Sequence, residues 1–417
     1  MNDLHGLRPR LLATPLRHAL AGSPVVVLTG ARQTGKSTLT RMLPDASSRT
    51  YQTLDDLDLL GLAERDPDAL IAASDRLAID EVQRAPSLLL AVKRAVDRDR
   101  RKGQFLLTGS ANLLLMRRIA ETLAGRATYL TLGPMSAAEI RGAAEPGPWA
   151  GLLACGSAAE AGRLLGARTV RPLAWREAIS RGGLPPAALE DDREARRRWF
   201  DGYVRTYLER DLQQLASIDA LPDFRRLLRV AALRSGTLLN QSELAREVGL
   251  SQPTVHRYLN LLETSCLIHR LEPYAVNRRK RIVRTPKLYF ADPGLAAFLA
   301  GWQSGPASED GLTGALLENL VLVQLLAWRE TVIPRPEVLF SRTAAGEEVD
   351  LVIETPDRLL PIEVKAGGRP GAEDLRWLGA FLEEHERVAP FGLVLCNAPE
   401  VRPAASNILA VPFAAVM

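Results

Sequence analysis

The sequence has few of the residues that build disulfides and metal centres. Its three cysteines, Cys155, Cys266 and Cys396, lie far apart and form neither an even disulfide set nor a metal-ligand spacing. The first residues show no basic patch followed by an apolar core, so a secretory signal is not expected. We therefore expect a cytoplasmic protein in a reducing compartment.

Long hydrophobic runs and a large excess of one charge are also missing. No apolar run comes near the roughly 18 residues that cross a bilayer, so we expect no membrane association. The net charge is only +4, although a pI near 9.1 favours polyanionic partners wherever the charge is clustered. With 47% hydrophobic and 24% charged residues, the 417-residue chain is expected to be globular, with two to four domains of about 150 residues.

The strongest motif is Gly30-Ala31-Arg32-Gln33-Thr34-Gly35-Lys36-Ser37, followed by Thr38, which fits G-x-x-x-x-G-K-[ST]. An apolar, β-branched run at 25–28 precedes it, and a helix-forming stretch at 38–43 follows. Glycines let backbone N–H groups point at phosphate oxygens, while Lys36 reaches the β- and γ-phosphates and Ser37 offers its hydroxyl to Mg²⁺. The motif predicts a nucleotide-binding loop.

Two further apolar strands end in polar residues. The strand at 77–81 ends in Asp80 and Glu81, where Asp80 would hold Mg²⁺ with Ser37 and Glu81 would polarise the attacking water. The strand at 104–112 ends in small polar residues, of which Thr108, Ser110 or Asn112 could sense the γ-phosphate or simply cap a helix.

Arg126 precedes another predicted strand, at 127–132. An arginine here is a candidate for stabilising the transition-state charge, in its own subunit or in a neighbouring one. The alternative is an ordinary surface arginine. Action on a neighbour would require a homo-oligomer, which the sequence allows but does not establish.

Together these segments resemble the AAA-type P-loop ATPases of bacteria and archaea whose second half is an uncharacterised region with a winged helix and a restriction-endonuclease-like end. The resemblance rests on Gly-Ala-Arg-Gln-Thr-Gly-Lys-Ser (30–37), Ile-Asp-Glu-Val-Gln (79–83), Leu-Thr-Gly-Ser (107–110) and Leu-Ala-Gly-Arg (123–126). It implies that Lys36, Ser37, Asp80 and Glu81 are the ATPase residues, with ATP and Mg²⁺ as cofactors.

A change of composition after Gly142 suggests a domain boundary. We expect an AAA-type ATPase domain over 1–142, and over 143–235 a linker and helical segment rich in Ala, Gly and Pro. Within this segment, Gly182-Gly183-Leu184-Pro185 predicts a rigid turn and 207–212 a helix. Both are familiar in the resembling family, but a purely structural role is the favoured interpretation.

Residues 236–300 predict a winged helix-turn-helix. One helix, a Gly249 turn, a Ser251 cap and a second helix follow one another, with polar side chains facing outward at the start of the second helix. Seven Lys or Arg residues and one acid lie between Arg270 and Lys287, so contact with DNA is expected. A protein-interaction module or an AAA lid is the alternative.

Residues 301–417 predict a restriction-endonuclease-like α/β domain. Asp350 opens one strand of a pair, and Glu363 and Lys365 lie two positions apart on the next, so both face one side. In that chemistry Asp350 and Glu363 bind Mg²⁺ or Mn²⁺, Glu318 from a preceding helix completes the cluster, and Lys365 positions the hydroxide or stabilises the phosphorane. Whether cleavage is retained stays open.

The fold class expected is α/β: a P-loop AAA-type parallel-sheet domain, then a helical and winged-helix domain, then a restriction-endonuclease-like domain. The leading hypothesis is an ATPase that binds and hydrolyses Mg-ATP and is coupled to a nuclease-like domain that acts on or holds DNA. The alternative is a nucleotide-dependent switch or antitoxin-like regulator that binds protein or DNA without nuclease activity.

Overall fold

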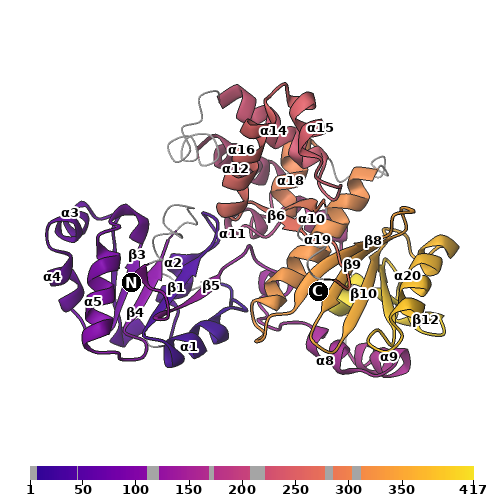
Figure 1. Ribbon diagram of the computed structural model, residues 1–417, viewed down its shortest axis with the longest axis horizontal. Coiled ribbons are helices and arrows are strands. Elements are labelled where there is room, and N and C mark those ends of the chain that lie inside the picture. Colours follow the sequence, from indigo (N-terminus) through magenta and orange to yellow (C-terminus); the bar gives the residue numbers. More distant parts are fainter. Residues whose placement is uncertain are drawn as a thin grey trace.

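Three lobes follow one another along the chain (Figure 1). The indigo N-terminal lobe and the orange and yellow C-terminal lobe lie on either side of a mostly helical middle lobe. The computed structural model describes residues 7–44, 46–109, 122–168, 173–206, 221–277, 285–302 and 311–417.

The N-terminal lobe is a five-stranded sheet in the order β2-β3-β4-β1-β5, with every pair parallel. Its strands are β1 (Val25–Thr29), β2 (Thr50–Thr53), β3 (Leu77–Asp80), β4 (Phe105–Thr108) and β5 (Ala127–Thr131). The helices are α1 (Ala13–Gly22), α2 (Lys36–Arg41), α3 (Leu57–Arg65), α4 (Pro67–Ala72), α5 (Leu88–Arg98) and α7 (Ala137–Ile140).

Both faces of this sheet are buried, because alternate residues of β1 point to opposite sides. Val25 and Val27 pack against α3, α4 and α5, whereas Val26 and Leu28 pack against α1 and α2. The parallel N-terminal sheet that the sequence predicts is confirmed.

The middle lobe consists of helices and one two-stranded antiparallel sheet, β6 paired with β7. Its elements are α10 (Trp175–Arg181), α11 (Pro185–Ala188), α12 (Arg193–Tyr203), α14 (Leu221–Leu233), α15 (Gln241–Val248), α16 (Gln252–Thr264), β6 (Ile268–Leu271), β7 (Lys287–Phe290) and α18 (Pro293–Ala300).

The predicted helix, glycine turn, serine cap and second helix are all present between α15 and α16. Gly249 ends α15 in the left-handed conformation, and the Ser251 hydroxyl accepts the Thr254 N–H to cap α16. The apolar residues expected to face inward are all buried: Leu244, Ala245, Val248, Val255, Leu259 and Leu262.

The C-terminal lobe is a six-stranded mixed sheet in the order β12-β13-β11-β10-β9-β8. Its elements are α19 (Gly311–Arg329), β8 (Glu337–Arg342), β9 (Glu348–Glu354), β10 (Leu359–Val364), α20 (Ala372–Glu384), β11 (Gly392–Cys396), β12 (Arg402–Ala405), β13 (Ile408–Pro412) and α21 (Phe413–Val416). The strands β10, β11 and β13 run parallel, and the outer pairs are antiparallel. Helix α20 packs on one face and α19 on the other.

Part of the expected linker belongs to the C-terminal lobe. Helices α8 (Trp149–Ala154) and α9 (Ala158–Gly166) pack on the side of that sheet that α19 also covers, as Figure 1 shows. The rings of Trp149 and Trp328 lie 6.5 Å apart. The segment after residue 142 therefore leaves the N-terminal lobe, adds two helices to the C-terminal lobe and returns to the middle lobe.

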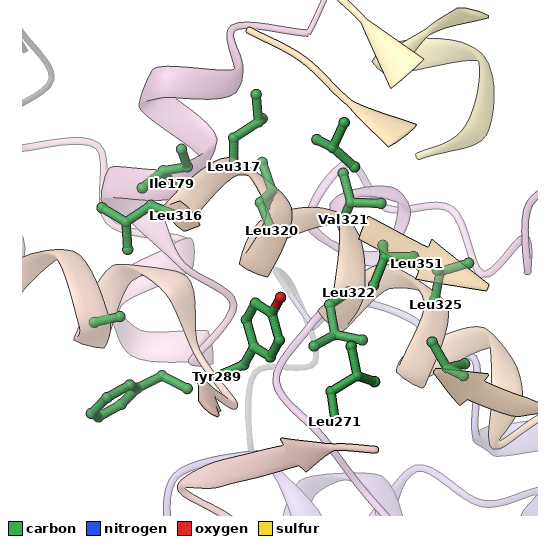
Figure 2. Packing of buried hydrophobic residues seen from close by; sticks show 14 of the residues in the cluster. Ile179, Leu271, Tyr289, Leu316, Leu317, Leu320, Val321, Leu322, Leu325 and Leu351 are labelled. Atoms are coloured by element: carbon green, nitrogen blue, oxygen red, sulfur yellow. The ribbon is translucent and has the colours of Figure 1, made fainter. Parts of the chain in front are cut away.

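Helix α19 corrects the expectation that no apolar segment is long enough to cross a membrane. Among the described residues, it is the one helix that is long and apolar enough to cross a membrane. However, 61% of its most apolar 18-residue stretch is buried inside the protein. Leu316, Leu320 and Leu325 belong to the largest core cluster, and Figure 2 shows Ile179, Leu271, Tyr289 and Leu351 packed around them. Within this fold α19 is the central core helix.

Candidate functional site

The loop between β1 and α2 has a backbone that its glycines make possible. Gly30 has φ +147° and Gly35 φ +91°, values that other residues rarely adopt. A Cβ on Gly30 would lie 2.2 Å from the Leu132 carbonyl oxygen, so no larger residue fits without displacement. The chain therefore turns sharply from the carboxyl end of the sheet into α2, the geometry of a phosphate-binding loop.

Lys36 lies buried inside this loop. Its Nζ donates to the carbonyl oxygens of Gly30 at 3.0 Å and Ala31 at 2.8 Å. Burial lowers the pKa of Lys36, and the nearby carboxylates of Glu81 and Asp80 oppose that shift. The ammonium is thus held beside both acids at the mouth of the loop, where a phosphate could replace the two carbonyls as its partner.

Asp80 is the centre of a hydrogen-bond network at the end of β3. Its carboxylate accepts hydroxyl hydrogen bonds from Ser37, from Thr108 on β4 and from Tyr51 on β2, the last at 2.5 Å. Burial alone would raise the pKa of Asp80, but these bonds together lower it. Asp80 is therefore an ionised carboxylate joined to the Ser37 hydroxyl, the two residues for which the sequence predicts a shared Mg²⁺ ion.

Glu81 directly follows the strand in an unusual conformation. Its φ is +56°, in the left-handed region, and its carboxylate accepts a hydrogen bond from the Gln83 amide. Strained backbone of this kind clusters at functional sites. Burial raises the pKa of Glu81, which suits a group that must take up a proton near neutral pH.

The other residues predicted to contact nucleotide differ in exposure. Arg32, Gln33 and Thr38 are exposed, whereas Ala31 and Thr34 are buried. Ser110 and Asn112 lie outside the described residues, so Thr108 is the described member of that predicted group, and it contacts Asp80.

Arg10 ties the phosphate-binding loop to the segment after β5, a role that the sequence did not reveal. Its guanidinium donates to the carbonyl oxygens of Thr34 at 2.5 Å and Gly133 at 2.7 Å, and pairs with Glu139 at 3.1 Å. Leu11 N–H donates to the same Glu139 carboxylate. A lone arginine before a helix carries no sequence signal for such a role.

The middle lobe also reaches the loop. The Tyr203 hydroxyl donates to the Arg32 carbonyl at 3.3 Å, and a Cβ on Gly35 would lie 3.9 Å from Cγ of Pro185. Cys266, which follows α16, lies near Lys36; burial raises the pKa of its thiol to about 11, and the Lys36 ammonium opposes the rise. Residues from two helices of the middle lobe and from the turn after α16 thus face the candidate nucleotide site.

The Gly182-Gly183-Leu184-Pro185 turn joins the loop to the rest of the middle lobe. Met135 N–H donates to the Gly183 carbonyl at 2.6 Å, while Gly183 and Leu184 N–H donate to the Asp292 carboxylate at 2.6 and 2.9 Å. Asp292 is buried and also caps α18 by accepting Leu295 N–H at 2.7 Å. The turn whose role its spacing left open is therefore a contact between lobes.

Arg126 is not brought to the nucleotide loop of its own chain. In the parallel register Ala127 pairs with Val25 and Thr131 with Thr29, so Arg126 lies at the edge of the sheet opposite the loop. It pairs with Asp97 at 2.6 Å. A role within the same subunit would need a residue at the other end of β5, so two of the expected interpretations stay open, an ordinary surface arginine and an arginine that acts on a neighbouring subunit.

Asp350, Glu363 and Lys365 come together on β9 and β10. The Asp350 carboxylate accepts Val364 N–H at 2.8 Å, and Lys365 Nζ lies 2.9 Å from Glu363 and 3.2 Å from Asp374. Burial raises the pKa of Asp350 and of Glu363, and the lysines nearby oppose this rise. The arrangement is a pair of carboxylates, Glu363 buried and Asp350 half-buried, with an ammonium beside it.

Glu318 from α19 faces the same region, but a different cation holds it. Lys287 of β7 lies 3.0 Å from Glu318 and 2.5 Å from Glu348, and the Tyr289 hydroxyl also donates to Glu318. Burial raises the pKa of Glu318 to about 7. Among the described residues, no group of three His, Cys, Asp or Glu side chains is arranged to hold a metal ion, so the predicted metal trio is not assembled in this conformation.

Some of the residues that the sequence predicts to contact DNA are exposed. Ser251, Gln252, His256 and Arg257 are exposed at the start of α16, and Thr254 is half-buried. Of the basic cluster, Arg270 pairs with Glu263 and Lys287 is buried, so neither presents a free charge; residues 278–284 lie outside the described residues, as does the predicted helix at 207–212.

Comparison with known protein families divides the chain into three matched segments. Residues 22–141 match the AAA domain, residues 173–305 match a domain of unknown function (DUF8612), and residues 313–416 match another domain of unknown function (DUF4143). The first segment contains the loop, Asp80 and Glu81; the third contains Glu318, Asp350 and Glu363.

Similar proteins are known from mycobacteria. The uncharacterized proteins Rv2008c of Mycobacterium tuberculosis and Mb2031c of Mycobacterium bovis are each 34% identical over 361 residues, which cover 86% of this chain and 74% of theirs. Among solved structures, the Walker-type ATPase PABY2304 of Pyrococcus abyssi is 17% identical with a TM-score of 0.45, over 71% of this chain and 99% of that one.

Proposed function

Because this chain belongs to the family of the uncharacterized mycobacterial protein Rv2008c, with an AAA domain before two domains of unknown function, we propose that it is a Mg-ATP-hydrolysing enzyme whose nucleotide state controls a DNA-directed C-terminal domain. The observation that carries the proposal is the convergence of Lys36, Asp80 and Glu81 at one loop. An ammonium, an ionised carboxylate and a carboxyl group of raised pKa are the groups that phosphoryl transfer to water requires.

Each group has a distinct role in this proposal. The loop amides and Lys36 bind the β- and γ-phosphates, with Lys36 exchanging its two carbonyl partners for phosphate oxygens. Glu81 orients the attacking water and accepts its proton, which its raised pKa favours. Two contacts keep the loop in position: Arg10 donates to the Thr34 carbonyl, and Tyr203 of the middle lobe donates to the Arg32 carbonyl.

The residues around Asp80 fit Mg²⁺. A serine hydroxyl and an ionised carboxylate are hard oxygen ligands, and Ser37 and Asp80 already contact each other. Bound there, Mg²⁺ would neutralise phosphate charge and hold the β- and γ-phosphates in one orientation. Tyr51 and Thr108 keep the Asp80 carboxylate ionised and correctly turned.

Asp80→Asn tests this assignment. Turnover of Mg-ATP should fall by about 10² or more, because the neutral amide no longer binds Mg²⁺. Its NH₂ group would also face the Tyr51 and Thr108 hydroxyls, which donate to Asp80 in the wild type. Asp75→Asn, at an exposed aspartate in the same lobe, should leave turnover unchanged. Equal turnover in both variants would refute the role of Asp80.

We further propose that α14 to β7 form a winged helix and that α19 with β8 to β11 forms a restriction-endonuclease-like domain. Support comes from the exposed polar start of α16 and from the positions of Asp350, Glu363 and Lys365 on adjacent strands. Plasmid and single-stranded DNA incubated with Mn²⁺ should be cleaved by the wild type, and Asp350→Ala and Lys365→Ala should abolish cleavage. Cleavage that survives both substitutions would refute the nuclease assignment.

A second candidate is favoured by one specific observation. Lys287 holds Glu318 and Glu348 where a metal-dependent nuclease would need free carboxylates, which suits a nucleotide-dependent switch that binds DNA or protein without cutting. Measuring DNA affinity at several salt concentrations distinguishes a DNA partner from a protein partner. Binding to DNA should weaken as salt rises, because each phosphate contact contributes about −0.9 to the slope of log affinity on log salt. Negligible binding at low salt would favour a protein partner.

A further inference from the structure

Lys287 lies at the junction of the middle and C-terminal lobes. It extends from β7, is 2% exposed, and its Nζ lies 3.0 Å from Glu318 Oε1 and 2.5 Å from Glu348 Oε1. The same ammonium lies 5.4 Å from the centre of the Phe340 ring. An ammonium this deeply buried is stable only because carboxylates surround it, so it belongs to the C-terminal acidic cluster rather than to a surface of the middle lobe.

Tyr289 reinforces the contact. Because successive strand residues alternate, Lys287 and Tyr289 project from the same side of β7. The Tyr289 hydroxyl and the Lys287 ammonium both donate to the same atom, Oε1 of Glu318. Figure 2 shows Tyr289 lying beside α19, the helix that carries Glu318. One carboxylate of the predicted metal site is thus held twice by the hairpin of β6 and β7.

A cleft leads from the surface to this ion pair. It has a volume of about 560 Å³ and is bordered by Arg234, Gly236, Thr237, Leu238, Glu243, Lys287, Arg342 and Glu348. Arg234 pairs with Glu243 and Glu247, and Arg342 pairs with Glu348. The cleft therefore reaches the Lys287–Glu348 pair, and the Lys287 ammonium stands between it and Glu318.

We propose that the Lys287 ammonium occupies the cation position of the C-terminal site and that a divalent cation binds there only by displacing it from Glu318 towards Glu348. This inference rests on the proposed assignment of Glu318, Asp350 and Glu363 to one metal site. Lys287 keeps Glu348 as a partner after displacement, so the exchange does not leave a buried ammonium unpaired.

The exchange requires movement of a side chain and not of the hairpin. The hairpin is fixed to β8 by backbone hydrogen bonds, Tyr274 N–H to the Phe340 carbonyl at 2.5 Å and Phe340 N–H to the Glu272 carbonyl at 3.2 Å. These bonds involve neither Lys287 nor Glu318. Metal binding would therefore change the charge at the junction of the lobes while their backbones stay joined.

Calorimetric titration of Mn²⁺ into the nucleotide-free full-length chain tests the proposal. Lys287→Met should tighten Mn²⁺ binding by about tenfold or more, the size of effect that partners of metal-binding residues commonly have. Tyr289→Phe, which removes one hydrogen bond and little volume, should tighten it by a smaller factor in the same direction. Lys102→Met, at an exposed lysine of the N-terminal lobe, should bind Mn²⁺ like the wild type.

Two further measurements make the outcome decisive. Adding Asp350→Asn to Lys287→Met should abolish the tight binding, and tight binding that persists would place it elsewhere and overturn the proposal. Should Lys287→Met fail to fold, as judged by its thermal transition, unchanged Mn²⁺ affinity in Tyr289→Phe would overturn it equally. Neither readout uses DNA, so an absence of DNA binding or cleavage refutes the proposed function without affecting this test.

Discussion

Asp292 offers the sharpest stability prediction. Its carboxylate accepts three backbone N–H groups, from Gly183, Leu184 and Leu295, at 2.6, 2.9 and 2.7 Å, and it is 2% exposed. Asp292→Ala leaves these three N–H donors unpaired in the interior, and each unpaired donor costs about 1–3 kcal/mol of folding free energy. Part of this cost is offset because the variant no longer has to bury a carboxylate. We expect a net loss of about 3 kcal/mol.

The assay is thermal unfolding followed by circular dichroism. A loss of about 3 kcal/mol corresponds to a fall in Tm of roughly 6–12 °C for a unit of 150–250 residues. Asp192→Ala is the matched control, because Asp192 also caps a helix but is exposed and accepts a single N–H, from Ala195 at 2.6 Å. That variant should lose only about 1 kcal/mol. Equal Tm values for the two variants would refute the reasoning.

Three other outcomes follow from the structure. Arg126→Ala should leave ATP turnover of dilute protein within about twofold of wild type, since Arg126 lies at the far edge of the sheet; a large loss would mean that it acts on a neighbouring subunit. Glu177→Gln should destabilise the chain by about 1–3 kcal/mol, measured as a fall in Tm, because buried Arg196 loses a charged partner at 2.9 Å that is itself only part-buried; a Tm like that of the wild type would contradict this. Mn²⁺ affinity of the C-terminal site should rise as pH passes through about 7, because the raised pKa of Glu318 keeps it protonated below that value; a flat profile from pH 6 to 8 would contradict this.

The nucleotide site was predictable because its signals are local. The residues from Gly30 to Ser37 lie within one strand-turn-helix unit, and Asp80 and Glu81 come at the end of a short apolar strand. The carboxyl ends of parallel strands lie at one edge of a sheet, so the residues that follow these strands come close together irrespective of the conformation of the connecting loops. Tyr51 was missed because it lies at the middle of β2, from which only its long side chain reaches Asp80.

Contacts between residues far apart in the sequence were not predictable from spacing. Asp292 meets Gly183 across 109 positions and Lys287 meets Glu318 across 31, and no local pattern specifies either pair. Lys287 was assigned to a basic surface because its neighbours in sequence are basic. In the structure, strand alternation turns it into the core beside Tyr289, which only the docking of β7 against α19 determines.

The segment after residue 142 was assigned to a linker for a related reason. Its richness in Ala and Gly hides the periodicity of α8 and α9. Helix α9 packs against β12 and β13, and α8 packs against α9. Short strands at the edge, such as β12, carry little apolar pattern because only one face is covered. These elements acquire their structure from the sheet on which they pack.

Steady-state ATP hydrolysis by Glu81→Gln, measured beside ATP binding, tests most directly whether the loop at Lys36 is a hydrolytic site. We predict a fall in turnover of about 10²–10⁴ with ATP affinity nearly unchanged, because the amide can neither orient nor deprotonate water while the phosphate contacts remain. Lys36→Ala should lose both binding and turnover. Turnover equal to wild type in both variants would contradict the assignment of this chain as an ATPase acting through these residues.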